Sequence, residues 1–347
     1  MPNAPDPGDE GIAGDRRPAL HAIVLAAGEG ARLARLTERL AGAPVSKQFC
    51  PFNGGRTPYQ KCITRLSAWI SRHRIIAVVA RDDSERATDQ LPATGAVELF
   101  SQFADCGTAI AVLGPLIEVL VRDPSAYVLI SPADLGVVDE AALRTTLRYA
   151  TGQAMAHQRT VLVGSPLARS SAGAGRLRPY EPALPGGPIV PLARLVAAPG
   201  AGAAEPATGN ALVDTQLVVA PARALLELYA KLYPRLLRMF LFWASLPVAE
   251  RAHYFDRAGR GLPRLDLQAD LLAFSHDLAV CCLPADAGVF DLDTEHAVIA
   301  WLAADASVAG HEPSLVPLAP ASDRPYRRTR VPAPSGIYPA VAVRAHA

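Results

Sequence analysis

The sequence lacks the cysteine spacing that a disulfide framework or a zinc site needs, and it carries little net charge. Its five cysteines are an odd number, and no two of them form a Cys-x-x-Cys pair, which argues against both kinds of site. Its 34 basic residues face 33 acidic ones, for a formal net charge of +1. Proteins that hold nucleic acid through a general basic field carry an excess of Lys and Arg, so we expect no nucleic-acid partner.

Long hydrophobic runs are also missing. The longest apolar stretches, around residues 236–247 and 108–116, are shorter than the roughly 18 uncharged residues that a membrane span needs. The first 18 residues are polar and acidic, which does not fit a secretory signal. We therefore expect a cytoplasmic protein with no membrane partner, and the sequence leaves homo-oligomerisation open.

The order of apolar runs predicts the fold class. Short apolar runs indicate buried strands, and amphipathic patterns between them indicate helices. Strands that alternate with helices predict an α/β fold, with a mainly parallel mixed sheet and helices on both faces. The predicted strands cover residues 21–27, 74–80, 126–130, 160–164, 212–219 and 279–283, and the predicted helices cover residues 57–71, 109–121, 140–150, 221–233 and 296–303.

Composition also predicts the domain limits. Half of the residues are hydrophobic, which is enough to build a large core in a chain of this length. We expect one domain over residues 19–303, a disordered tail over residues 1–18 and a Pro-rich tail over residues 304–347. Residues 165–210 are rich in Gly and Pro, and we expect loops and short strands there that meet the substrate.

The first predicted strand runs into the sequence LAAGEGARL at residues 25–33. Gly28 and Gly30 after a strand let backbone amides turn towards an anion, and the following helix adds its positive end. A dinucleotide fingerprint needs a third glycine where Leu33 stands, and a P-loop needs Gly-Lys-Ser/Thr, which is missing. What remains is Gly-x-Gly-x-Arg, in which Arg32 offers the planar fork that suits phosphate.

Further motifs follow in order: SKQF at 46–49, GGRTPYQ at 54–60, DCGTA at 105–109, SPAD at 131–134 and FDLDT at 290–294. With the glycine loop, they resemble the sugar-1-phosphate nucleotidyltransferases. The resemblance is closest to the mannose-1-phosphate guanylyltransferase branch, whose pattern is a Gly-rich loop with Arg, then Pro-Lys-Gln-Phe, then Gly-x-Thr-x-x-Gln. It spans residues 21–301 and implies the Rossmann-like nucleotide-diphospho-sugar transferase fold.

The resemblance implies roles for the residues that match. Arg32 would stabilise the leaving pyrophosphate, and Lys47 would offset charge at the α-phosphate. Asp134 and Asp291 would hold Mg²⁺; each follows a strand-like run, so the sheet can bring both to one edge. The nucleotide-binding set is Ala26, Ala27, Gly28, Gly30, Arg32, Lys47, Gly107 and Thr108.

Several of these residues have a structural alternative. Asp134 could cap the helix predicted at 140–150, and Gly107–Thr108 could simply start a helix. Asp293 competes with Asp291 for the metal but could instead cap the last helix, so we favour Asp291. Arg32 and Lys47 could each be an ordinary exposed side chain, although Lys47 is one of only three lysines.

Departures from the family pattern fall on the acceptor side. Glu-Lys-Pro becomes Ala-Ala-Pro at 197–199, which removes the lysine that would meet the sugar phosphate. Asn-Ser-Gly becomes Asp-Thr-Gln at 214–216, and Gly-Tyr-Gly-Tyr-Ile becomes GAGRL at 173–177. Because alanine cannot neutralise a phosphate dianion, we hypothesise that Arg176 or Arg178 does so. The predicted acceptor-binding set is Gly175, Arg176 and Asp214.

The sequence therefore predicts an Mg²⁺-dependent nucleotidyltransferase that moves a nucleoside monophosphate from an NTP, with GTP favoured, to a sugar 1-phosphate. Two alternatives stay open because the acceptor motifs are rewritten. One is a catalytically silent, nucleotide-binding regulatory relative. The other is a nucleotidyltransferase with a non-sugar phosphorylated acceptor, because FDLDT also resembles the ending of cytidylyl- and molybdopterin-type transferases.

Overall fold

The computed structural model describes residues 18–28, 30–91, 97–102, 104–166, 175–196, 210–259 and 261–309. Residues 1–17 and 310–347, which hold most of the two predicted tails, lie outside that part of the chain, as do residues 173–174 and 197–199. None of the helices within the described ranges has both the length and the apolar character of a membrane-spanning segment.

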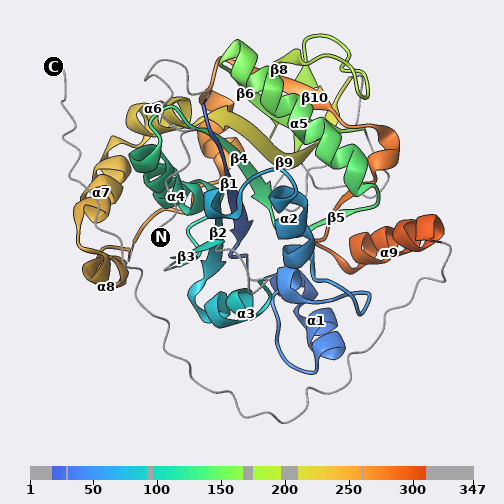
Figure 1. Cartoon of the computed structure of the whole chain (residues 1–347), viewed down its shortest axis with the longest axis horizontal. Coiled ribbons are helices and arrows are strands. Elements are labelled where there is room, and N and C mark those ends of the chain that lie inside the picture. The colour runs from blue at the N-terminus through green and yellow to red at the C-terminus, as the bar shows by residue number, and fades with distance from the viewer. Residues whose placement is uncertain are drawn as a thin grey trace, which may run out of the picture.

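A mixed sheet forms the centre of the molecule (Figure 1). Its strand order is β3-β2-β1-β4-β9-β6-β10-β8-β7. Strands β3, β2, β1 and β4 run parallel, as do β6 and β10, whereas β9 pairs antiparallel with both β4 and β6. The strands are β1 (Leu20–Ala26), β2 (Ile75–Ala80), β3 (Glu98–Gln102), β4 (Tyr127–Pro132), β6 (Thr160–Ser165), β7 (Arg176–Pro179), β8 (Val190–Val196), β9 (Leu212–Pro221) and β10 (Leu278–Cys282).

Helices cover both faces of this sheet, as the alternation of strand side chains requires. In β1, Ile23 packs with helices α4, α6 and α7 in one core, whereas Ala22 and Val24 pack with α2 and α5 in the other. The helices are α1 (Ala34–Ala41), α2 (Pro58–Ser67), α3 (Ser84–Asp89), α4 (Thr108–Arg122), α5 (Glu140–His157), α6 (Ala222–Leu232), α7 (Pro234–Ser245), α8 (Val248–Ala258) and α9 (Glu295–Ala309). The predicted α/β, Rossmann-like class is confirmed.

The strands and helices predicted from periodicity all exist, but several of their ends differ. Helix α5 continues to His157 rather than ending near residue 150, and α9 continues to Ala309, past the predicted domain limit at residue 303. Strands β7 and β8 lie within residues 165–210, where short strands are expected. The apolar runs and helical patterns do not predict β3, which is short and carries polar side chains, or helices α3, α7 and α8.

Two very short strands form a separate two-stranded antiparallel sheet beside the main sheet. Strand β5 (Leu135–Val137) pairs antiparallel with β11 (Val289–Asp291). Asp291 lies opposite Leu135, and Leu292 N–H donates to the Asp134 carbonyl at 3.3 Å. This pairing joins two segments far apart in the sequence and places their aspartates together.

Candidate active site

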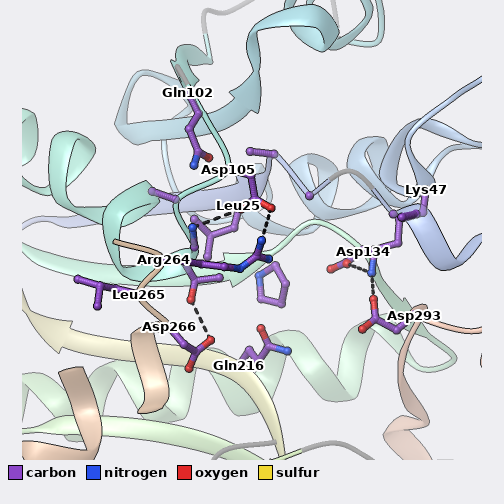
Figure 2. A pocket seen from close by; sticks show the side chains of 18 of the residues that line it. Leu25, Lys47, Gln102, Asp105, Asp134, Gln216, Arg264, Leu265, Asp266 and Asp293 are labelled. Carbon is purple, nitrogen blue, oxygen red and sulfur yellow. Dashed lines mark hydrogen bonds and ion pairs between the residues drawn. The ribbon is translucent and has the colours of Figure 1, made fainter. Parts of the chain in front are cut away.

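A pocket of about 630 Å³ opens at the carboxyl ends of β1 and β4. Leu25 and Pro132, which pair across these two strands, form part of its floor. The glycine loop lines the pocket. The segments at 105–108 and 264–266 line the side away from Lys47 and Asp134 (Figure 2). This is the edge at which open α/β sheets bind ligands.

Lys47 lies in a cluster of carboxylates at one end of the pocket. Its side chain is only 7 % exposed, and Nζ donates to Asp134 Oδ2 at 2.6 Å and also contacts Asp293 Oδ1 (Figure 2). Asp134, Asp291 and Asp293 each offer a carboxylate oxygen within 4.8 Å of the others. Asp134 follows β4, Asp291 ends β11, and Lys47 starts a 3-10 turn, Lys47–Phe49.

Burial and charge act against each other in this cluster. Burial alone would lower the pKa of Lys47, but Asp134, Asp293 and Asp291 outweigh it and raise that pKa above its ordinary value. Burial, with Asp134 and Asp293 nearby, raises the pKa of Asp291. Lys47 therefore stays positively charged, and its single positive charge faces three carboxylates.

The helix-cap roles considered as alternatives for Asp134 and Asp293 belong to other residues. Asp139, not Asp134, caps α5, because its carboxylate accepts from Ala141 N at 2.8 Å and Ala142 N at 2.9 Å. Thr294, not Asp293, accepts from Ala297 N at 3.2 Å at the start of α9. Asp134 and Asp293 are thus available to the Lys47 cluster. Asp291 and Asp293 both belong to this cluster, and Asp293 also lines the pocket; the preference for Asp291 as the metal ligand stays a prediction.

The glycine loop lies next to Lys47. Gly30 has a φ of +62°, and an added Cβ would come within 3.1 Å of Lys47 Cγ, so the position favours glycine. Gln48, which the sequence did not single out, donates through Nε2 to the carbonyls of Ala26 at 2.7 Å and Gly28 at 3.1 Å. Buried Gln48 therefore holds the loop's entry in place.

Arg32 lies at the mouth of the pocket. Its side chain is 75 % exposed, and Nη1 is 3.6 Å from Asp293 Oδ2. The predicted nucleotide residues Ala27, Gly28, Gly30 and Arg32 all line the pocket. Ala26 is instead buried below the loop, where it contributes its carbonyl to Gln48.

The other end of the pocket is built from two chain segments that dock through their backbones. Leu265 N–H donates to the Cys106 carbonyl at 2.9 Å, and Ala109 N–H donates to the Leu265 carbonyl at 3.0 Å. Gly107, at a φ of +83°, lies so close that an added Cβ would be 2.3 Å from Leu265 O. Thr108 Oγ1 accepts from Leu267 N–H at 2.8 Å.

Charged side chains stand on this docked surface. Arg264 Nη1 donates to Asp105 Oδ2 at 2.7 Å, and Thr108 Oγ1 donates to Asp266 Oδ2 at 3.2 Å (Figure 2). Gly107 and Thr108 line the pocket, as the sequence predicts. The polar lining residues that lie outside the predicted site sets are Gln102, Asp105, Gln216, Arg264, Asp266, Asp270 and Asp293.

The predicted acceptor residues come together where β7 pairs with β9. Asp214 N–H donates to the Gly175 carbonyl at 3.0 Å, and Arg176 pairs with Val213 across β7 and β9. In the described part of the chain, none of Gly175, Arg176 and Asp214 lines the pocket. Burial raises the pKa of Asp214 to about 7. The residue of β9 that lines the pocket is Gln216, and the assignment of Gly175, Arg176 and Asp214 to the acceptor stays a prediction.

The carboxylate cluster suits a divalent cation. Mg²⁺ prefers hard oxygen ligands and takes one or two carboxylates together with substrate phosphates. Asp134, Asp291 and Asp293 supply such oxygens at the edge of the pocket, beside the loop that faces it. Because Lys47 Nζ contacts two of the three carboxylates, a cation that binds there also has to displace or share these contacts.

The comparisons with known proteins agree with this geometry. Residues 22–187 match the MobA-like NTP transferase domain, a range that holds the glycine loop, Lys47, the 105–108 segment and Asp134. No curated protein matches the chain.

Solved structures share the fold over most of the chain. A structure described as a mannose-1-phosphate geranyltransferase from Thermus thermophilus is 22 % identical, with a TM-score of 0.67 over 81 % of this chain and 78 % of its own. A mannose-6-phosphate isomerase from Helicobacter pylori is 14 % identical, with a TM-score of 0.58 over 77 % and 98 %. A UDP-glucose pyrophosphorylase from Acinetobacter baumanii is 14 % identical, with a TM-score of 0.52 over 86 % and 95 %.

At these identities the solved structures show the fold, and the domain match carries the class of reaction. The matched range includes the glycine loop, Lys47 and Asp134, whereas Asp291 and Asp293 lie outside it. The protein is a nucleotidyltransferase, and its residues 22–187 match the MobA-like NTP transferase domain.

Proposed function

We propose that the protein transfers a nucleoside monophosphate from an NTP to a sugar 1-phosphate and releases pyrophosphate, with GTP as the favoured donor and Mg²⁺ as the cofactor. The observation that carries this proposal is the cluster of Lys47, Asp134, Asp291 and Asp293 beside a Gly-x-Gly-x-Arg loop at the pocket edge. The preference for GTP and a sugar acceptor rests on the resemblance to mannose-1-phosphate guanylyltransferases.

The reaction is a displacement at phosphorus. A phosphate oxygen of the acceptor attacks the α-phosphorus of the NTP and forms the new P–O bond. The bond between the α-phosphorus and the bridging oxygen breaks, and its electron pair leaves with pyrophosphate. No side chain has to form a covalent bond, so the protein contributes position and charge.

The cation end of the pocket is the end that holds Lys47, Asp134, Asp291 and Asp293. Its residues and the glycine loop beside it divide this work between them. Gly28 and Gly30 leave the loop open to the phosphates, with no side chain in the way. Lys47 is a fixed cation that offsets charge at the α-phosphate, and Arg32, at the pocket mouth, offsets charge on the leaving pyrophosphate. Asp134, Asp291 and Asp293 would hold Mg²⁺, which supplies Lewis-acid charge neutralisation at the phosphates when bound.

Pyrophosphate release tests the proposal directly. We expect release from GTP with mannose 1-phosphate or glucose 1-phosphate, and only when the sugar phosphate and Mg²⁺ are both present. A protein that binds GTP but releases no pyrophosphate with any phosphorylated acceptor would instead be the silent regulatory relative. Release with a non-sugar phosphate alone would move the acceptor outside the sugars.

A further inference from the structure

Two residues other than glycine have positive φ among the described residues: Gln158 at +52° and Gln216 at +60°. Gln158 follows the last residue of α5, where a left-handed residue is a common way to end a helix. Gln216 lies inside strand β9, and no helix ends there. A strained backbone inside a strand persists only where its surroundings hold it, and such positions gather at binding sites.

A β-bulge accounts for the conformation of Gln216. Between the pairs Leu162–Val218 and Gly164–Asp214, β6 advances two residues while β9 advances four. Thr215 Oγ1 anchors the bulge by donating to the Val163 carbonyl at 2.6 Å. Gln216 N–H donates to the Asp214 carboxylate at 2.8 Å.

The bulge directs one side chain of β9 into the pocket. Bulges break the in–out alternation of a strand and re-aim side chains. Asp214 is accordingly buried, whereas Gln216, two residues further along, lines the pocket. In Figure 2 its amide lies between Asp266 and Asp293. Gln216 therefore lies between the cation end of the pocket and the opposite end, where Arg264 lies.

Gln216 and Pro132 both line the pocket beyond the end of the β4–β9 ladder. The β4–β9 ladder ends at the pair Ile130–Val218, two residues short of both Pro132 and Gln216, and both line the pocket. Asp134 of the cation cluster follows Pro132 by two residues. Gln216 thus approaches from β9, away from the glycine loop that supplies the phosphate side.

We propose that Gln216 is a specificity-determining residue that hydrogen-bonds a hydroxyl group of the sugar acceptor; this inference rests on the proposed function. A primary amide carries both donors and an acceptor, so it can satisfy a hydroxyl group that also does both. It carries no charge for a phosphate, which Lys47 and Arg32 already serve. A site built to bond a hydroxyl discriminates against an analogue that lacks it.

The test compares Gln216→Gly with Gln158→Gly. Both variants put glycine where the backbone is already left-handed, so both should fold and be at least as stable to heat as the wild type. Only Gln216→Gly removes an amide from the pocket. Binding of mannose 1-phosphate and glucose 1-phosphate is measured by calorimetry on protein saturated with Mg²⁺ and a GTP analogue that has a methylene α–β bridge.

We expect Gln216→Gly to weaken the sugar phosphate that the wild type binds about 5- to 10-fold, the size of one neutral hydrogen bond. Its Kd for the GTP analogue alone should stay within about twofold of the wild type, because the loop and Lys47 are unchanged. Gln158→Gly should match the wild type in both. Acceptors that each lack one hydroxyl group identify the bonded hydroxyl. The wild type should bind one of these deoxy sugars as weakly as Gln216→Gly binds the parent sugar. Gln216→Gly should bind that deoxy sugar and the parent sugar equally well.

Each other outcome is also decisive. Unchanged acceptor binding by Gln216→Gly, or an equal loss of the GTP analogue, overturns the role of Gln216 while pyrophosphate release by the wild type keeps the proposed function. If Gln216→Gly binds the sugar phosphate more weakly than the wild type does, but the wild type never releases pyrophosphate, only the proposed function is overturned. A wild type that binds neither sugar phosphate overturns both.

Discussion

The two ends of the pocket are built on different principles. At the cation end, charged side chains from three separate segments contact one another at short range: Lys47, largely buried, faces Asp134, Asp291 and Asp293. At the other end, the segments around Gly107 and Leu265 dock through backbone hydrogen bonds. The charged pair that stands on this end, Arg264 with Asp105, has an arginine that is 74 % exposed.

This difference predicts where changes matter most. Charges shielded from water interact strongly, whereas an exposed ion pair contributes little. Substitutions at the cation end should therefore alter chemistry by orders of magnitude. At the other end, a backbone change should matter more than the loss of a charge. The following variants are ordered by expected effect, and each tests this contrast.

Asp134→Asn should have the largest effect. It removes one carboxylate charge that faces both Lys47 and the proposed metal, and we expect pyrophosphate release to fall at least about 10³-fold. The control is Asp139→Asn, the same chemical change at the cap of α5, where asparagine caps equally well; it should leave release and stability unchanged. If Asp134→Asn kept a tenth of the wild-type rate, the cluster would not be the catalytic centre.

Lys47→Met should separate the two roles of the lysine. Loss of the cation should lower kcat about 10²-fold. Nucleotide-free protein should nevertheless bind Mn²⁺ at least about 10-fold more tightly, because the three carboxylates lose their internal counter-ion.

Mn²⁺ binding to this variant is measured by electron paramagnetic resonance. Lys231→Met, on the exposed surface of α6, is the matched control and should change neither quantity. Unchanged or weaker Mn²⁺ binding by Lys47→Met would show that the ammonium group does not compete with the cation.

The contrast between the two ends also explains what the sequence could predict. Every strand from a continuous apolar run was predictable, and so was the cation end, because Lys47, Asp134 and Asp291 stand in short motifs next to such runs. The joint membership of Asp291 and Asp293 in the cluster was not predictable. It depends on the pairing of β5 with β11, three residues each, and on Thr294 acting as the cap.

The opposite end of the pocket could not be predicted from short local motifs. Arg264 and Asp105 lie 159 residues apart, and nothing in either local pattern indicates that their backbones dock. Asp214 was predictable as part of a motif, but at the bulge of β9 it is Gln216, and not Asp214, that lines the pocket. Only the antiparallel register of β6 and β9 reveals that bulge.

Gly107→Ala should disrupt the docked end through the backbone. The new Cβ would meet Leu265 O, and alanine disfavours the left-handed φ, so the free energy of unfolding should fall by about 1–3 kcal/mol. GTP affinity should fall with it, whereas Mn²⁺ binding at the cation end should be retained. Gly152→Ala, in α5 with open space around its Cβ, should instead stabilise by about 0.5–1 kcal/mol. Equal stability of the two variants in urea titrations would contradict the docking.

Arg264→Ala should have the smallest effect on stability. The arginine is exposed and its bond to Asp105 competes with water, so the free energy of unfolding should change by less than about 1 kcal/mol. Arg159→Ala removes a pair with Asp277 in which the arginine is 32 % exposed; this pair does not line the pocket, and its loss should also change the free energy of unfolding by less than about 1 kcal/mol. The two variants should differ in ligand binding: only Arg264→Ala should alter the GTP Kd, by about two- to fivefold, because Arg264 lines the pocket. A larger stability loss in urea titrations for Arg264→Ala than for Gly107→Ala would mean that side-chain charge, and not the backbone, holds the two segments together.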